Sequence, residues 1–583
     1  MSEQVRWFEQ ISMRDGIRLA ATIYLPSPSS GPRPGLLAMT PYGRDTYHAH
    51  ALDFAKHGYV SMVVDVRGRG DSEGDFDPFF SDGRDGHDLV EWLASQPYCN
   101  GRIGMHGGSY GGMTQWATAR ARPKSLRSIV PTAPSYLGFD IPTHAGIFPS
   151  YWMQWLTLTQ GKQTHFNGFG DSVVWRDIFT ELYRERAPFA RLDVIAGSRA
   201  TKFQEWLAHA EPGPYWERAA LSDDDYANLR LPILSITGLF DGAIVPTLEY
   251  VRRHAAAGPP EAVAQHFLVI GPWDHAGTRV PKAEIGGIRF GPQSLLDMNE
   301  LHRAWYAWTL EGGQRPSLLK DRVLYYVTGA EEWRHAPSID AATDMHAPFF
   351  LQAPDGRAHD VFASGALASH ELATPAATYQ YDPLDIRPAD VQPALDIVGG
   401  LQPLDQTAAH NLFGNGLVYH TAPLEDAVVL SGLPEVHLFI ALDVPDTDLQ
   451  VALHHVMPDG RAMELGVDML RARYRRSLQS AELIEPGVIN EYAFRRLPFI
   501  ARRLEKYSRI RLVVSCPNSP YTEKNYNAGG DVSRETAADA RTATVTVHHA
   551  APFASYVVLP FGPLTTSNRF TNAELAPWIG AGT

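Results

Sequence analysis

The strongest chemical signal in this chain is a serine among glycines, in the pentapeptide Gly-Gly-Ser-Tyr-Gly at residues 107–111. The pattern G-x-S-x-G is typical of a strand that turns sharply into a helix with a serine at the apex. A serine held in so cramped a turn needs neighbours without Cβ atoms, which the glycines supply. The pentapeptide alone could be an ordinary glycine-rich turn. Residues 102–106 suit a short buried strand and residues 113–119 a helix, so we predict that Ser109 is a nucleophile.

A serine hydroxyl is a poor nucleophile at neutral pH, so it needs a base, and the base needs an orienting acid. In a strand–turn–helix fold the chain order is serine, acid, histidine, and both partners follow the carboxyl ends of later strands. Asp241 follows the apolar run 233–237, and His275 follows the run 267–270. Taken singly, Asp241 could be a turn aspartate and His275 a surface histidine. Their order and strand-end positions favour Asp241 as the acid and His275 as the base.

Three other polar residues are rivals for these roles. Asp274 precedes the histidine, but a side chain adjacent in sequence rarely reaches Nδ1 of the next residue. His106 lies three residues before the serine, and we expect it to pack inside the sheet. Asp65 comes before the serine in the chain, and we interpret it as a structural residue that organises the loop 67–74.

A tetrahedral intermediate needs hydrogen-bond donors aimed at its oxyanion. One should be the backbone N–H of Tyr110, the residue after the nucleophile, and the second should come from the loop after the strand at residues 35–40. That loop contains Tyr42, whose phenol could donate in place of a backbone amide. The alternative is that Tyr42 is only an aromatic side chain packed beside Pro41.

The elements that must position these residues alternate along the chain. Apolar runs at 35–40, 59–66, 128–133, 231–238 and 266–271 alternate with helical segments, which predicts a mostly parallel sheet covered on both faces. A hairpin over residues 5–25 precedes it. Residues 140–225 are rich in tryptophan and tyrosine without clear strand runs, which indicates a helical cap. From about residue 345 short alternating runs predict a β-sandwich of jelly-roll type.

The fold class is therefore α/β, an α/β-hydrolase core with a helical cap insertion and a C-terminal β-sandwich. We place the first part of the core at residues 1–138, the cap at 139–229, the second part of the core at 230–344 and the jelly roll at 345–583.

Composition excludes several classes of function. The net charge of −14 argues against a nucleic-acid binder, which would need a basic face. The two cysteines, Cys99 and Cys516, allow neither a disulfide framework nor a metal-ligand spacing. The chain has no signal-peptide pattern and no run of about 18 apolar residues that could span a membrane. We expect a cytoplasmic protein, and its chemistry requires neither a metal nor an organic cofactor.

Taken together, these motifs resemble a known family, the cocaine esterase and X-Pro dipeptidyl-peptidase group of α/β-hydrolases, which includes the α-amino acid ester hydrolases. The similar segments are Pro41-Tyr42, DVRGRGDS at 65–72, GGSYGG at 107–112, FDG at 240–242, GPWDH at 271–275, MPDGR at 457–461 and RARY at 471–474. The resemblance implies Ser109 as nucleophile, His275 as base and Asp241 as acid. It also implies an oxyanion hole formed by the Tyr42 hydroxyl and the Tyr110 amide.

The chain departs from two branches of that group. The α-amino acid ester hydrolases carry acidic residues shortly after the triad aspartate, where they hold the substrate's ammonium group. Here Asp241 is followed by Gly-Ala-Ile-Val at 242–245, without a carboxylate, and Asp140 near the start of the cap could supply a lone charge. The X-Pro peptidases have a larger N-terminal domain than the hairpin found here. We therefore expect the esterase branch, with an uncharged or hydrophobic acyl group.

The predicted function is that of a serine esterase acting on a small-molecule ester or amide through an acyl-enzyme. One alternative is transfer of the acyl group to an amine or alcohol, or a peptidase or acylase activity, with the same triad. A different class of function is a non-catalytic protein whose jelly roll binds a ligand. Apolar surface on the jelly roll or cap is where a homodimer would form.

Overall fold

A computed structural model describes residues 4–27, 31–392, 403–407 and 409–580. Its central element is a ten-stranded sheet of order β1-β2-β4-β3-β5-β6-β7-β8-β11-β12. The strands from β4 to β11 in this order run parallel, whereas β1, β2 and β12 are antiparallel additions at the two edges. Their bounds are β1 Gln4–Ser12, β2 Arg18–Leu25, β3 Arg33–Thr40, β4 Val60–Asp65, β5 Cys99–Gly108, β6 Leu126–Thr132, β7 Ile233–Gly238, β8 His266–Gly271, β11 Val323–Val327 and β12 Glu332–Ala336.

Helices cover both faces of the parallel part of this sheet, which explains why strands such as β4, β7 and β8 are buried along their whole length. On one face lie α2 (Asp82–Ala94), α3 (Tyr110–Arg120) and α11 (Ile244–Ala257), and on the other lie α1 (His48–Lys56) and α13 (Met298–Glu311). In β8, for example, Phe267 and Val269 join the cluster that contains α13, while Leu268 and Ile270 pack against α11. A short helix α12 (Pro260–Val263) and the small hairpin β9 (Glu284–Ile285) and β10 (Ile288–Arg289) complete the core.

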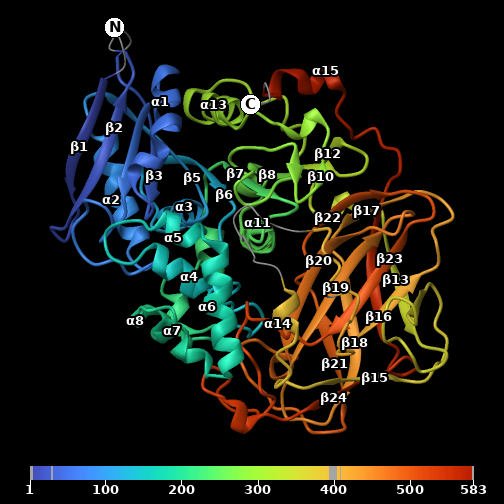
Figure 1. Ribbon diagram of the computed structural model, residues 1–583. Coiled ribbons are helices and arrows are strands. Elements are labelled where there is room, and N and C mark those ends of the chain that lie inside the picture. Colours follow the sequence, from blue (N-terminus) through green and yellow to red (C-terminus); the bar gives the residue numbers. More distant parts are fainter. Residues whose placement is uncertain (1–3, 28–30, 393–402, 408, 581–583) are drawn as a thin grey trace.

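The segment between β6 and β7 is helical, as the sequence indicated. Its helices form a layer beside the core sheet (Figure 1). Tryptophans from this layer are buried and stack on one another and on Phe79, with Trp155 and Trp206 6.3 Å apart between ring centroids. The aromatic residues therefore form the segment's own core. Its helices are α4 Tyr151–Leu158, α5 Phe166–Gly170, α6 Ser172–Glu185, α7 Leu192–Ile195, α8 Thr201–Ala208, α9 Pro214–Glu217 and α10 Asp223–Ala227.

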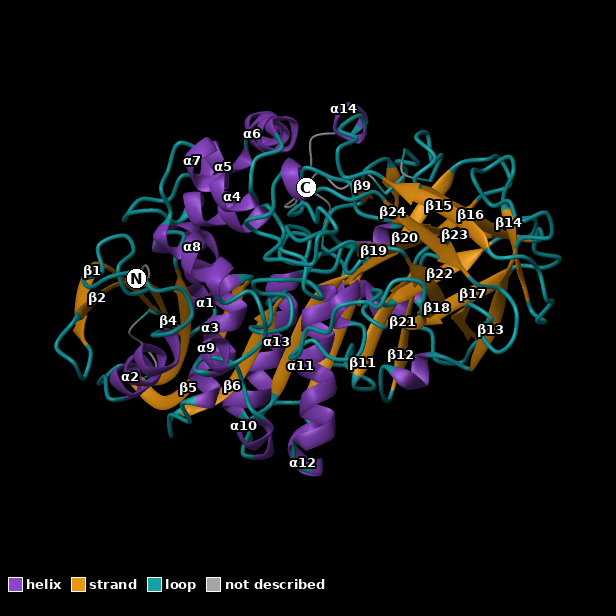
Figure 2. Ribbon diagram, turned by 90° about the horizontal axis from the view of Figure 1, so that it is seen from below, coloured by secondary structure: helices purple, strands orange, loops and turns teal. Residues whose placement is uncertain are grey.

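The C-terminal part is a thirteen-stranded sheet that folds around one apolar core. Figure 2 shows it beside the core sheet, with most helices gathered around the latter. Its strands are β13 Met345–Gln352, β14 Gly365–Ala368, β15 Ala377–Tyr381, β16 Gly416–Thr421, β17 Val428–Gly432, β18 Glu435–Leu442, β19 Asp448–Val456, β20 Ala462–Arg471, β21 Ile489–Phe494, β22 Ile500–Leu504, β23 Arg509–Ser515, β24 Ala543–Val547 and β25 Tyr556–Gly562. The short helix α14 (Pro388–Val391) lies between β15 and β16.

We expected all residues after 345 to belong to the β-rich domain, but the segment that follows β25 packs on the core instead. After β25 the chain returns to the core, where α15 (Asn572–Leu575) lies near α13 (Figure 1). Phe570, Leu575 and Trp578 are buried in the cluster that contains α13 and β11, and the Asp297 N–H donates to the Trp578 carbonyl at 2.8 Å. The physical reason is apolar burial, because these three side chains cover that end of the core.

Contacts with the helical segment and with the core both hold the β-rich domain in place, and one example of each follows. The buried guanidinium of Arg471 pairs with Asp448 and Glu523 at 2.8 Å each, and the Arg471 N–H donates to the Ala145 carbonyl at the start of the helical segment. On the core side, the Thr328 N–H donates to the carbonyl of Ala501 on β22 at 3.0 Å. None of the described helices is long and apolar enough to cross a membrane.

Candidate active site

Ser109 stands at the tight turn between β5 and α3, in a conformation that side chains rarely adopt, with φ 60° and ψ −121°. The turn is closed by a hydrogen bond from the Ser109 N–H to the Thr132 carbonyl at 2.9 Å. Gly107 has φ 142°, and a Cβ on Gly112 would lie 2.9 Å from the Thr132 carbonyl oxygen. The glycines thus make room for the serine, and the strained backbone holds its hydroxyl at the strand end, as is common at functional sites.

Asp241 and His275 meet at the carboxyl ends of the adjacent strands β7 and β8. The Asp241 carboxylate is buried, and its Oδ1 lies 2.9 Å from His275 Nδ1. The same oxygen accepts the N–H of Ala243 at 2.9 Å, which fixes the carboxylate in its turn. Because Nδ1 faces the carboxylate, this pairing leaves Nε2 of His275 as the nitrogen that could accept a proton.

The rival residues have other partners. The buried Asp274 carboxylate accepts the Gly277 N–H at 2.6 Å and so shapes the turn after β8. His106 is buried and stacks on His50, 5.0 Å away between ring centroids. Asp65, the last residue of β4, accepts the Arg44 N–H at 2.7 Å, and its backbone carbonyl accepts the Ser72 hydroxyl of the following loop at 2.6 Å. All three therefore have structural contacts of the kind expected from the sequence.

Tyr42 lies beside Ser109, and its hydroxyl accepts a hydrogen bond from Nε1 of Trp155 on α4 at 3.0 Å. Burial raises the pKa of Tyr42, and its hydrogen bonds with Trp155 and Ser109 partly offset that rise. The phenol is therefore neutral near pH 7. Because the indole N–H occupies an oxygen lone pair, the phenol's own hydrogen remains available for donation on the serine side.

Tyr110 presents its backbone rather than its ring to the site. As the first residue of α3, it has an N–H without an acceptor within the helix. Its buried phenol accepts the Phe79 N–H at 2.9 Å and hydrogen-bonds to Asp82 on α2. Burial and the Asp82 carboxylate raise the pKa of this phenol well above its usual value, so the ring serves as a neutral packing element.

Asp140, the lone charge considered from the sequence, lies in a cavity of about 660 Å³ together with Asp241. Its carboxylate accepts the Tyr136 N–H at 2.5 Å, and burial raises its pKa to about 6. The same cavity is lined by Phe240, Ile244 and other apolar residues of the loop after β7 and by residues of the β-rich domain. The hydrogen bond from Tyr136 therefore holds the Asp140 carboxylate in a turn of the chain.

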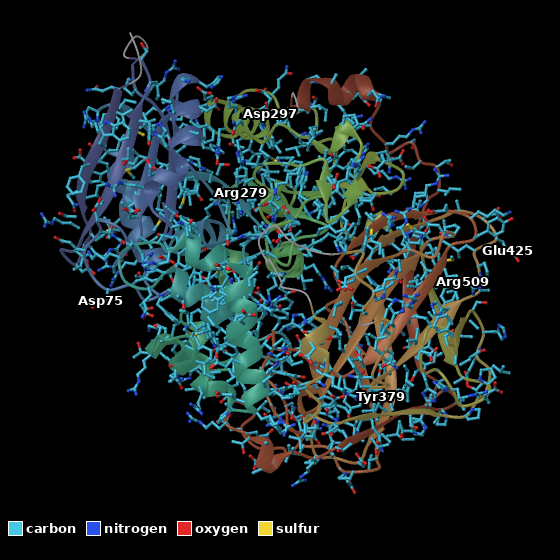
Figure 3. The ribbon with its side chains drawn as sticks, viewed as in Figure 1. Asp75, Arg279, Asp297, Tyr379, Glu425 and Arg509 are labelled. Atoms are coloured by element: carbon cyan, nitrogen blue, oxygen red, sulfur yellow. The ribbon has the colours of Figure 1, made fainter. Side chains whose placement is uncertain are left out.

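Two residues of the site were missed by the sequence analysis. Trp155 comes from the helical segment, where the sequence showed many aromatic residues and no signal to select this one. Arg279 follows His275 by four residues, and its side chain lies against Gly108, next to the nucleophile. Figure 3 shows Arg279 in the same part of the molecule as the central strands of Figure 1. A cation in the loop after the predicted base was a signal that could have found it.

The fold is that of the α/β-hydrolase class, and Ser109, Asp241 and His275 all lie at the carboxyl ends of strands of its central sheet. Residues 15–277 match the family model of the X-Pro dipeptidyl-peptidase (S15 family), and residues 318–558 match that of the X-Pro dipeptidyl-peptidase C-terminal non-catalytic domain. These matches confirm the resemblance to the cocaine esterase and X-Pro dipeptidyl-peptidase group, and with it the α/β-hydrolase core and the β-rich C-terminal domain.

Individual relatives cover almost the whole chain. It is 29% identical over 571 residues to a cocaine esterase of Rhodococcus sp. (strain MB1 Bresler), which is 94% of this chain and 97% of that protein. Among solved structures, an aminopeptidase from a marine sediment archaeon, Thaumarchaeota archaeon, is similar with a TM-score of 0.82 at 22% identity, over 97% of both chains. An α-amino acid ester hydrolase has a TM-score of 0.79 at 21% identity, over 96% of this chain and 97% of that one. Both of these structures share the fold of this chain.

Proposed function

We propose that this serine ester hydrolase cleaves small carboxylic esters through an acyl-enzyme formed on Ser109. His275 Nε2 accepts the proton of the Ser109 hydroxyl as its oxygen attacks the ester carbonyl, and then passes that proton to the leaving alkoxide. Asp241 holds the Nδ1–H and stabilises the imidazolium. Water then attacks the acyl-serine with His275 again as base, which releases the acid and restores the enzyme.

The oxyanion of each tetrahedral intermediate would rest on the Tyr42 hydroxyl and the Tyr110 N–H. The observation that carries the proposal is the position of the Tyr42 hydroxyl, which is hydrogen-bonded both to Trp155 and to Ser109. A donor that is already fixed beside the nucleophile needs no reorganisation when negative charge develops, which is the most effective form of this stabilisation.

An ester is favoured over a substrate with a free α-amino group. Two of the similar proteins are named for ester cleavage, and one structural neighbour is an aminopeptidase. In this chain, however, the residues after Asp241 offer no carboxylate for an ammonium group, and Ala243 and Ile244 are buried apolar residues. A further proposal is that the β-rich domain adopts a jelly roll.

The test compares wild type, Ser109→Ala and a control, Ser477→Ala, in a loop of the β-rich domain. Each is assayed with aryl esters of increasing acyl length and with a fluorophosphonate that labels activated serines. We expect wild type and the control to hydrolyse esters and to take up one phosphonate per chain, and Ser109→Ala to do neither. Labelling or turnover that persists in Ser109→Ala would exclude Ser109 as the nucleophile.

A further inference from the structure

Arg279 occupies a position beside the nucleophile that the proposed triad chemistry does not use. Its N–H donates to the Ala276 carbonyl at 3.1 Å, so the residue is fixed in the turn that also carries His275. Its side chain crosses to β5 and lies on Gly108. A Cβ built on Gly108 would be only 2.8 Å from Arg279 Cδ and closer still to Nη1.

This contact explains a glycine that backbone geometry does not require. Gly107 needs its glycine because its φ is positive, but Gly108 has no such φ. A side chain at 108 would instead displace the guanidinium. The nucleophile turn is therefore built to admit a cation next to Ser109.

The guanidinium has no counter-charge among the described residues. No hydrogen bond or ion pair of its side chain is found there, and Nη1 is buried without a hydrogen-bond partner. Its electrostatic neighbours are the neutral phenols of Tyr42 and Tyr47. By contrast, buried Arg471 has two carboxylates, and Arg67 pairs with Asp85 at 2.6 Å.

Removing a cation partly from water without a partner costs free energy, and a bound anion offsets that cost. Its place beside the nucleophile means that an ester bound for attack would also lie beside it. The planar guanidinium fork matches the two oxygens of a carboxylate.

We propose that Arg279 binds a carboxylate carried by the substrate close to the scissile ester. The inference rests on the proposed function and narrows it, because the preferred substrates become anionic esters, such as half-esters of dicarboxylic acids. This proposal replaces the uncharged or hydrophobic acyl group expected from the sequence with an acyl group that carries a negative charge. Apolar surface is present too, since Phe166 is 48% exposed and lies 6.4 Å from the Tyr42 ring.

The test uses aryl esters of matched length, a glutarate half-ester and the neutral pentanoate ester. Wild type, Arg279→Gln, Arg279→Lys and the control Arg495→Gln are compared. Arg495 lies on the surface of the β-rich domain with a side chain 64% exposed, so its replacement changes net charge equally without touching the site. Thermal melting checks that each variant folds.

We expect wild type to prefer the glutarate half-ester by at least about tenfold in kcat/KM. Arg279→Gln should lose about 10- to 100-fold on that ester, mainly through KM, and change less than about threefold on the pentanoate. Arg279→Lys should keep part of the preference, and Arg495→Gln all of it. Free glutarate should inhibit pentanoate hydrolysis more weakly in Arg279→Gln than in wild type.

Two results would overturn the inference. If Arg279→Gln loses activity equally on both esters, Arg279 acts through oxyanion electrostatics or through structure. If wild type shows no preference for the anionic ester, Arg279 does not bind a substrate carboxylate. In either case Ser109-dependent hydrolysis of the pentanoate would leave the proposed function intact. If neither ester is hydrolysed, and Ser109 takes up no phosphonate, the proposed function fails and the inference fails with it.

Discussion

Replacing Tyr42 by phenylalanine removes a single oxygen atom from the candidate oxyanion hole. That oxygen accepts the Trp155 indole N–H at 3.0 Å and is hydrogen-bonded to Ser109. Loss of one oxyanion donor raises the activation barrier by about 2.7–4 kcal/mol, which corresponds to about a 10²–10³-fold lower kcat. The Tyr110 N–H remains, so we expect residual activity rather than complete loss.

The same change affects stability in a separate way. Trp155 is 4% exposed, and without the Tyr42 oxygen its N–H has lost its acceptor. A buried donor left without a partner costs about 1–3 kcal/mol of the free energy of unfolding. Urea unfolding measures this cost, and steady-state hydrolysis of an aryl ester measures kcat on the fraction that is folded.

Trp155→Phe is the matched control, because it removes the indole N–H and keeps the Tyr42 hydroxyl. We expect its kcat to fall less than about tenfold, since the phenol keeps its donor hydrogen and loses only a fixed orientation. If Tyr42→Phe keeps kcat within twofold of wild type, Tyr42 is not an oxyanion donor. If Trp155→Phe is as slow as Tyr42→Phe, the position of the ring matters rather than its hydroxyl.

Four further predictions follow from other parts of the structure. Asp241→Asn should lower kcat by about 10⁴-fold, because an amide favours the wrong imidazole tautomer, and a loss below tenfold in the ester assay would contradict this role. Burial lowers the pKa of His254 to about 4, so its neutral form stabilises the fold above pH 6.5, and about 3 kcal/mol is lost as the pH falls from 6.5 to 4. In urea unfolding at several pH values His254→Leu should show a shallower pH dependence, and an unchanged slope would exclude this residue as a cause. Cys99 and Cys516 are both free and buried, and burial raises the pKa of Cys516 to about 12, so a thiol reagent should find no reactive group in the native protein and two in denaturant. Arg471→Met should lower the free energy of unfolding by about 3–5 kcal/mol, because it leaves two carboxylates buried without their cation, and a loss under 1 kcal/mol would show that this cluster is readily hydrated.

Much of the fold could be predicted from the sequence because its signals are local. Buried parallel strands have short, continuous apolar sequences, and the turn at Ser109 needs glycines because it leaves no room for Cβ atoms. Asp241 and His275 were found because they follow two such runs, and the structure brings them within 2.9 Å. Their catalytic roles stay predictions.

What the sequence did not reveal depends on contacts between distant segments. Trp155 reaches Tyr42 across 113 positions of the chain, and nothing in the helical segment distinguishes it from its neighbours. A role for Arg279 could be inferred only from the contact of its side chain with Gly108. The C-terminal tail has apolar residues typical of any packed helix, and their partners on the core could not be read from their spacing.

The buried cluster around Arg471 has a consequence for exchanging parts between relatives. The Arg471 N–H donates to the Ala145 carbonyl at the start of the helical segment. Glu523, which pairs with Arg471, donates its own N–H to the Phe148 carbonyl and accepts the Phe148 N–H through its carboxylate. The seam between the helical segment and the β-rich domain therefore contains hydrogen bonds between buried polar groups of the β-rich domain and the backbone of the helical segment, in addition to apolar contacts such as that of Phe179 with Tyr521. A chimera that replaces the β-rich domain alone could leave the Ala145 carbonyl and the Phe148 backbone without these partners, so the domain should be exchanged together with residues 144–150.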